Sequence, residues 1–373
     1  MKSTSVRRAI VPGIAALAIV LSGCGAGNET TAPGTDASAG TSDGAATGLT
    51  GTLKGAGATS QEKAQEAWYT AVQGQNDGFT VEYNLTGSTD GRTMFVDGGV
   101  AFAGTDSAMT DEEGQLTDAT ATCGAEPIQV PAYVSPIAVF FNLPDITSLN
   151  MTPDTIAQIF DGKITSWDDP AIIATNQGVT LPATKITPVH RSDDSGTTKN
   201  FTDYLNKTAP EAWPYPADDP FPVDGEAADG TSGVVKSVES TEGFIGYADN
   251  SQVAEGDGRV SVAVGDGFEA PSPEGAAKVV EVSPGVEGAS DVDMAIDLDR
   301  TTTEAGAYPV VLLSYLVACQ SYDDAETEAN VKGYLSYIVS DAGQQEAAGY
   351  AGSAPLSAAT AAKAQEIVAG IGG

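Results

Sequence analysis

Apolar and polar positions alternate along the chain so that short strands and amphipathic helices follow one another. The first predicted strands lie at 50–54, 79–84 and 99–104, and helices open at the glycine- and hydroxyl-rich turns 55–60 and 87–91. This succession is typical of an α/β domain with a largely parallel sheet. The sequence therefore predicts an α/β fold that begins near residue 49.

Two longer apolar runs, at 128–143 and 308–319, are too short and too often interrupted by proline to cross a membrane as helices. We interpret them as buried core strands. Between and after them the pattern predicts helices at 152–160, 197–205, 331–338 and 357–371, strands at 186–190 and 244–247, and a loop at 210–230.

The first residues have the pattern of a secretion signal. Lys2, Arg7 and Arg8 precede an apolar run at 9–21 that ends in Leu-Ser-Gly-Cys, which resembles a bacterial lipobox. We expect residues 1–23 to be a signal peptide and Cys24 to carry lipid, which would anchor the chain without a membrane-spanning helix. The alternative is an ordinary signal peptide with a chance cysteine. Residues 24–48 lack large apolar side chains and predict a flexible tether.

Charge excludes several partners. The chain carries 17 Lys+Arg against 51 Asp+Glu, a net charge of -34, with 41% hydrophobic residues, as in a globular protein. This acidity disfavours nucleic acid and an anionic membrane surface. By the same logic, an anionic small molecule is at first disfavoured too.

The counts of histidine and cysteine exclude much metal and redox chemistry. The one histidine is His190, and the three cysteines form no CxxC pair, so we expect no metal and no cofactor, while metal sites made purely of carboxylates remain open. With Cys24 lipidated, Cys123 and Cys319 remain as a pair outside the cytoplasm, where disulfides persist. A disulfide between them and two buried free thiols both remain open.

Three strand-to-helix turns combine glycine with hydroxyl side chains: Gly-Ala-Thr-Ser at 57–60, Gly-Ser-Thr at 87–89 and Ser-Gly-Thr-Thr at 195–198. The first N–H groups of a helix lack internal partners and attract anions. Taken singly, each turn is as well explained by ordinary helix capping. If the three converge, they form a neutral cage for an oxyanion. None matches the nucleotide P-loop pattern.

Arg191 lies just before the third turn, and its guanidinium suits an oxyanion bidentately. Asp193 could hold that side chain in place; the alternative is a surface ion pair of little value. His190 is best explained as a strand-end residue that orients this loop. Ser195 has no second histidine to act as a base, which argues against a nucleophile.

Asp106 follows the strand at 99–104 and would repel an anion unless the anion donates a proton. Hydrogen phosphate carries such a proton at neutral pH and sulfate does not, so an aspartate here would select phosphate. The alternative is an ordinary turn-forming aspartate.

These motifs resemble the phosphate-binding lipoproteins of the bacterial phosphate-specific ABC transporter. The resemblance runs from Gly55 to the last helix and is most specific in FDGKITSWDD at 160–169 and in the arginine loop at 188–198. It implies a phosphate site at the positions that correspond to the family's site: Thr59, Ser60, Ser88, Asp106, Arg191, Ser195, Gly196 and Thr197, with Asp193 supporting the arginine. Ser60, Asp90 and Asp194 depart from the family pattern, which puts the affinity in question.

The resemblance also implies a two-lobed, Venus-flytrap fold with a mixed, mostly parallel sheet in each lobe. One lobe would combine 49–133 with 307–373, the other would span 134–306, and two crossover strands near 130–136 and 308–313 would form the hinge. The expected protein is a non-enzymatic, monomeric, lipid-anchored solute-binding protein outside the cytoplasm that passes phosphate to an ABC permease. The alternatives are a binding protein for sulfate or molybdate, an extracellular phosphatase, and a surface adhesin or sensor that keeps the fold.

Overall fold

The computed structural model describes residues 47–111 and 114–373. The predicted signal peptide, Cys24 and all but the last two residues of the predicted tether lie outside these residues. Within the described part, the model contains no helix with the length and apolar character that a membrane crossing requires.

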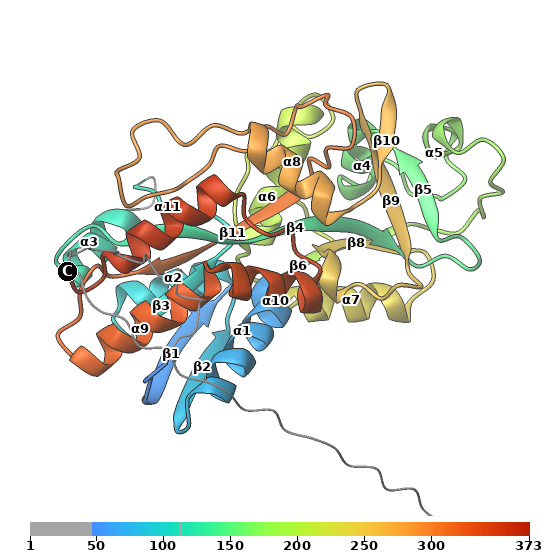
Figure 1. Ribbon diagram of the computed structural model, residues 1–373. Coiled ribbons are helices and arrows are strands. Elements are labelled where there is room, and N and C mark those ends of the chain that lie inside the picture. The colour runs from blue at the N-terminus through green and yellow to red at the C-terminus, as the bar shows by residue number, and fades with distance from the viewer. Residues whose placement is uncertain (1–46, 112–113) are drawn as a thin grey trace, which may run out of the picture. The chain divides into compact units, whose positions relative to one another are not determined.

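The beginning of the described chain forms a parallel arrangement of three strands with helices between them (Figure 1). The central strand β1 pairs in parallel with β2 on one side and β3 on the other. In order, the elements are β1 (Gly51–Gly57), the short 3-10 helix η1 (Thr59–Gln61), α1 (Glu62–Gln75), β2 (Phe79–Leu85), α2 (Ser88–Val96), β3 (Phe102–Thr105) and α3 (Gln115–Cys123).

The first helix begins later than the sequence predicts. Gly55 and Gly57 belong to β1, and a Cβ atom at Gly55 would lie 2.2 Å from the ring of Phe102 on the neighbouring strand. The glycines here therefore serve close strand packing, and the helical turn opens only at Thr59.

Two long strands run through the middle of the sheet. β4 (Ile128–Phe141) and β11 (Val311–Ala318) are buried along their whole lengths and pair antiparallel. β11 also pairs with β3, whereas the second part of β4 pairs with β8, so β4 belongs to both halves of the sheet. This burial confirms the interpretation of both apolar runs as core strands. The register shifts between Ser314 and Tyr315, which pair with Tyr133 and Pro131, so Ala132 is the extra residue in β4.

The second half of the sheet follows the order β4-β8-β6-β7, and β6 pairs in parallel with both of its neighbours. β9 attaches to β4 and carries β5 and β10. The strands are β5 (Ser148–Met151), β6 (Thr187–Arg191), β7 (Glu226–Ala228), β8 (Phe244–Asp249), β9 (Gly258–Val264) and β10 (Gly267–Glu269). The helices are α4 (Pro153–Phe160), α5 (Pro170–Thr175), α6 (Gly196–Thr208), α7 (Gly230–Ser240), the 3-10 helix η2 (Asn250–Gln252) and α8 (Pro273–Val282).

Three helices close the chain: α9 (Ala325–Ile338), α10 (Asp341–Ala351) and α11 (Ala358–Ala369). α10 and α9 pack against α1, and the indole N–H of Trp68 on α1 donates to the carbonyl of Gly343, 2.8 Å away. Chain segments about 275 positions apart thus share one core.

A disulfide joins Cys123, at the end of α3, to Cys319, just after β11, with their Cα atoms 5.3 Å apart. It fixes the helix that follows β3 to the end of the long central strand. The pairing left open by the sequence is therefore the bridged one in this structure.

Candidate functional site

The predicted site residues converge around Asp106, which directly follows β3. Its carboxylate is almost fully buried and accepts hydrogen bonds from three hydroxyl groups on separate elements. Ser60 donates to both carboxylate oxygens at 2.7 and 2.8 Å, Ser314 to Oδ1 at 2.7 Å and Thr197 to Oδ2 at 2.8 Å. Burial raises the pKa of Asp106, although these three hydroxyls and the Arg191 charge oppose the rise.

The turn between β1 and α1 supplies Thr59 and Ser60. Gly57 has φ of +142°, and a Cβ atom there would lie 1.9 Å from the carbonyl oxygen of Gly104, so only glycine fits. The Thr59 hydroxyl lies 2.9 Å from that of Thr231 and accepts a hydrogen bond from the Thr231 amide at 3.1 Å.

The turn between β2 and α2 approaches the site from a second direction. The Ser88 hydroxyl accepts the backbone N–H of Asp106 at 3.1 Å. Gly87, with φ of +88°, lies so close to the arginine loop that its Cβ would be 3.0 Å from a carboxylate oxygen of Asp193. Asp90, one of the departures from the family pattern, is exposed.

The third turn begins α6. Ser195 caps this helix by accepting the Thr198 N–H at 3.2 Å, while the amides of Gly196 and Thr197 belong to the first turn, which has no intrahelical partners. A Cβ atom at Gly196 would lie 2.8 Å from both Asp106 Cβ and Ser88 Oγ. This close approach brings the positive end of α6 against Asp106 and against the turn that begins α2.

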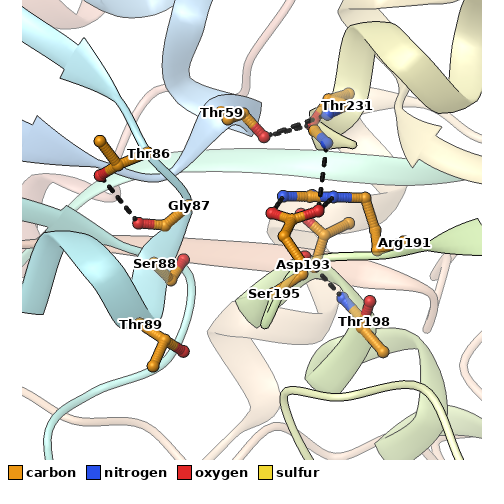
Figure 2. Close-up of polar contacts among 12 residues, drawn as sticks. Thr59, Thr86, Gly87, Ser88, Thr89, Arg191, Asp193, Ser195, Thr198 and Thr231 are labelled. Carbon is orange, nitrogen blue, oxygen red and sulfur yellow. Dashed lines mark hydrogen bonds and ion pairs between the residues drawn. The ribbon is translucent and has the colours of Figure 1, made fainter. Parts of the chain in front are cut away.

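Arg191 ends β6 and is held from one side by Asp193 (Figure 2). Its Nε donates to Asp193 Oδ1 at 2.7 Å and its Nη2 pairs with Oδ2; the Gly230 amide also donates to Oδ1, at 3.1 Å. Burial would raise the pKa of Asp193, but the hydrogen bond and charge of Arg191 outweigh burial, so the pKa is lowered. Asp193 thus occupies one edge of the guanidinium, which leaves its remaining N–H groups for an anion.

His190 and Asp194 flank the Arg191–Asp193 pair in the same loop. The His190 ring bonds the Arg191 carbonyl at 2.8 Å and stacks on Phe221 with ring centroids 4.5 Å apart, which suits a residue that orients the loop. Asp194, a further departure from the family pattern, is exposed.

Two contributors were not predicted. Ser314 is a single hydroxyl within the apolar strand β11, and only the pairing of β11 with β3 brings it to Asp106. Thr231 begins α7 in the sequence Gly-Thr-Ser, the same glycine-plus-hydroxyl pattern as the three predicted turns. That pattern could have identified Thr231, whereas nothing local identifies Ser314.

Taken together, the site offers helix N-termini, hydroxyl groups and the Arg191 guanidinium, with the Asp106 carboxylate among the donors and the Asp193 carboxylate on the guanidinium. Such a set can surround a dehydrated oxyanion and can accept one proton from it. Among the residues that the structure describes, no cluster of three or more His, Cys, Asp or Glu side chains could hold a metal ion.

Comparison with known proteins places this fold in a class. The sheet crossed by β4 and β11 is the two-lobed α/β architecture of the PBP superfamily, whose domain model matches residues 34–342. The phosphate-binding protein PstS2 of Mycobacterium bovis is 33% identical over 356 residues, covering 93% of this chain and 94% of that protein. PstS 3 of Mycobacterium leprae is 34% identical over 351 residues, with 92% and 93% coverage. The chain belongs to the family of these PstS proteins.

Solved structures agree on the fold. A high-affinity periplasmic phosphate-binding protein bound with phosphate superposes with a TM-score of 0.69 at 21% identity, covering 85% of this chain and 93% of that one. A phosphate-binding protein from Stenotrophomonas maltophilia gives a TM-score of 0.65 at 19% identity, with the same coverage.

Proposed function

We propose that this chain captures inorganic phosphate between the two halves of its sheet and delivers it to the permease of an ABC transporter. The observation that carries the proposal is the buried Asp106 carboxylate, enclosed by hydroxyl donors and the N-terminus of α6 and lying beside Arg191. The names of the relatives, all phosphate-binding proteins, support the choice of ligand.

In the proposed complex, phosphate takes over donors that now serve Asp106 or each other. Thr59, Ser60, Ser88, Ser195 and Thr197 would supply hydroxyl groups, Gly196 and Thr197 would supply amides, and Arg191 would supply charge-assisted bonds. Asp106 would then accept the remaining proton of hydrogen phosphate. A fully deprotonated sulfate has no proton to give, so it would face an acceptor–acceptor clash.

Capture requires the site to open. We propose that residues 49–133 with 307–373 form one lobe, that 134–306 form the other, and that β4 and β11 bend as the hinge between them. The three turns that enclose Asp106 come from both of these segments, so separating the lobes would take the site apart.

We further propose that the protein works outside the cytoplasm as a monomer, held to the membrane by lipid on Cys24, and that it performs no catalysis. The signal-like start of the sequence supports the location. In the absence of a base for Ser195, a binding role accounts for the site better than ester hydrolysis.

A thermal-shift panel tests the ligand. A ligand that binds only the folded state raises the melting temperature in proportion to the logarithm of its excess over Kd. We expect phosphate and arsenate to raise it and sulfate and molybdate to leave it unchanged. A response to sulfate or molybdate alone would assign the chain to another oxyanion, and release of product from a chromogenic phosphate ester would contradict a purely binding role.

A further inference from the structure

A buried ion pair lies beside the site. Arg92 on α2 and Asp219, in the loop between α6 and β7, place Nη2 and Oδ2 2.6 Å apart, with side chains only 3% and 5% exposed. α2 packs against β1 and β3, whereas the loop of Asp219 belongs to the half of the sheet built around β6 and β8. The pair therefore joins the two halves of the sheet.

Arg92 and Asp219 each also make a hydrogen bond to a residue that frames the anion site. Nη1 of Arg92 donates to the Thr105 hydroxyl at 2.9 Å, immediately before Asp106. The backbone carbonyl of Asp219 accepts the N–H of Ser195, the cap of α6, at 3.0 Å. The chain of contacts from Thr105 through Arg92 and Asp219 to Ser195 thus links the strand end that presents Asp106 to the helix that presents Gly196 and Thr197.

Arg92 and Asp219 differ in how fully their polar atoms are hydrogen-bonded. Arg92 has further acceptors in its own half, Ser107 Oγ at 3.0 Å and Gln115 Oε1 at 2.7 Å. Asp219 Oδ2 also accepts the Thr89 hydroxyl at 2.7 Å, but its Oδ1 is buried with no hydrogen-bond partner among the described residues. A buried pair with one unsatisfied oxygen gains little net free energy, because desolvation offsets much of the attraction. Such a pair suits a contact that must form and break repeatedly.

We propose that Arg92 and Asp219 form a latch that holds the two halves together around the anion and so sets how slowly phosphate leaves. The proposal rests on the proposed phosphate-binding function. Both residues act by positioning, because their contacts are to protein groups that frame the site. When the halves separate, Arg92 keeps its other partners and Asp219 regains water, so the pair stabilises the closed state alone.

The test is stopped-flow dissociation of phosphate from the full chain carrying Asp219→Asn, Arg92→Gln, or both. Asp219→Asn leaves the Arg92 cation buried without a carboxylate partner in the closed state alone, so it destabilises the closed state. We therefore expect phosphate to dissociate on the order of tenfold faster or more. Association should change less, as is usual for changes at one interface. The dissociation rate of the double variant should be close to that of one single variant, and no higher than the two separate effects combined, because both changes remove the same contact.

A control variant removes an ion pair that lies within one half. Asp161 pairs with Lys163 at 2.7 Å, and both belong to the half around β6 and β8, so Asp161→Asn should leave phosphate dissociation unchanged. Because Arg92→Gln could impair folding, each variant is first checked by thermal melting, and Asp219→Asn alone suffices if Arg92→Gln does not fold.

The latch and the phosphate function can fail separately. If the unmodified chain does not bind phosphate, the proposed function fails; the latch is then still tested by small-angle scattering, where Asp219→Asn should increase the radius of gyration of the ligand-free protein. If the unmodified chain binds phosphate and folded Asp219→Asn releases it at the same rate, the latch proposal is overturned. An equal acceleration by Asp161→Asn would overturn it as well.

Discussion

Asp106 shows how one side chain can decide which anion a site accepts. Among the residues that the structure describes, its carboxylate receives only hydroxyl donors and lies near the Arg191 guanidinium, so the same donors can turn to an anion that itself brings a proton. Asp106 and Arg191 could be predicted from the sequence because a charged side chain in a glycine- and hydroxyl-rich turn indicates a functional role. Ser314 could not be predicted, since a lone serine in an apolar strand has many explanations and only strand pairing places it.

Replacing Arg191 by alanine should abolish most phosphate binding. The guanidinium is buried and braced by Asp193, so its loss removes the cation and leaves that carboxylate unpaired. Truncating one partner of a buried charge pair costs about 2–5 kcal/mol, and we expect a loss of affinity in that range. Isothermal titration calorimetry measures it. Asp194→Asn is the control in the same loop, because Asp194 is exposed; an unaffected Arg191→Ala would remove this arginine from the site.

Helix α6 contributes to the anion site through the position of its N-terminus as well as through its side chains. The sequence predicted its start within one residue, because Ser195, Gly196 and Thr197 form a capping turn, but it could not show that this turn packs against β3 and α2. Other elements were not predicted, among them the helices α7 and α10. The short strand β7, which lies inside the predicted loop at 210–230, was not predicted either. Weak periodicity in small-residue segments such as α10 is overridden by long-range packing.

A methyl group at Gly196 should prevent closure without unfolding α6. Alanine suits a first helical turn, and the φ of Gly196 is not in the left-handed region, so helix stability should be kept. The added Cβ would nevertheless lie 2.8 Å from Asp106 and Ser88. We expect Gly196→Ala to bind phosphate at least tenfold more weakly by calorimetry, a cost of about 1.4 kcal/mol or more. Gly74→Ala on α1, where the added atom meets nothing within 4 Å, should bind normally; equal affinity in both variants would contradict the close approach.

Asp249, at the end of β8, should make the folded state sensitive to pH. Burial raises the pKa of this carboxyl from 3.8 to about 6, against the hydrogen bonds of Ser251 and Tyr133, and its Oδ2 has no partner among the described residues. A carboxyl group whose pKa is higher in the folded than in the unfolded state contributes stability at pH values below its ordinary pKa. This contribution is lost as the pH rises from about 4 through about 6. The full loss corresponds to about 3 kcal/mol.

Asp249→Asn should therefore flatten the pH dependence of stability between about pH 4 and pH 7. Urea unfolding at both ends of this window, with and without the substitution, measures the difference in the free energy of unfolding. Asn keeps the acceptor that Tyr133 and Ser251 use at Oδ1. An identical pH slope in both proteins would show that Asp249 does not titrate there.

The net charge of the whole molecule at first argued against an anionic ligand, and that inference was too coarse. Without residues 1–23 the chain keeps 14 cations and 51 acids, a net charge of -37. Charge of this kind acts at long range and is screened within about 8 Å at physiological salt. A buried site is governed by the few groups that contact the ligand. The acidity should therefore affect how fast phosphate arrives and leave specificity unchanged.

Phosphate association should accordingly speed up as ionic strength increases, because salt screens the repulsion between an acidic protein and an anion. Stopped-flow association in a series of chloride concentrations at constant pH measures the effect. Chloride competition is checked by adding chloride to the calorimetric titration. An association rate that falls with salt would mean that a local positive potential dominates the approach.

The central claim is that this chain binds phosphate and that the Asp106 carboxylate selects it. Isothermal titration calorimetry of the unmodified chain and of Asp106→Asn, each with phosphate and with sulfate, tests both parts at once. We predict heat from phosphate and none from sulfate in the unmodified chain, with weaker phosphate binding and measurable sulfate binding in Asp106→Asn. Equal affinity of the unmodified chain for the two anions, or no heat from phosphate, would contradict the account.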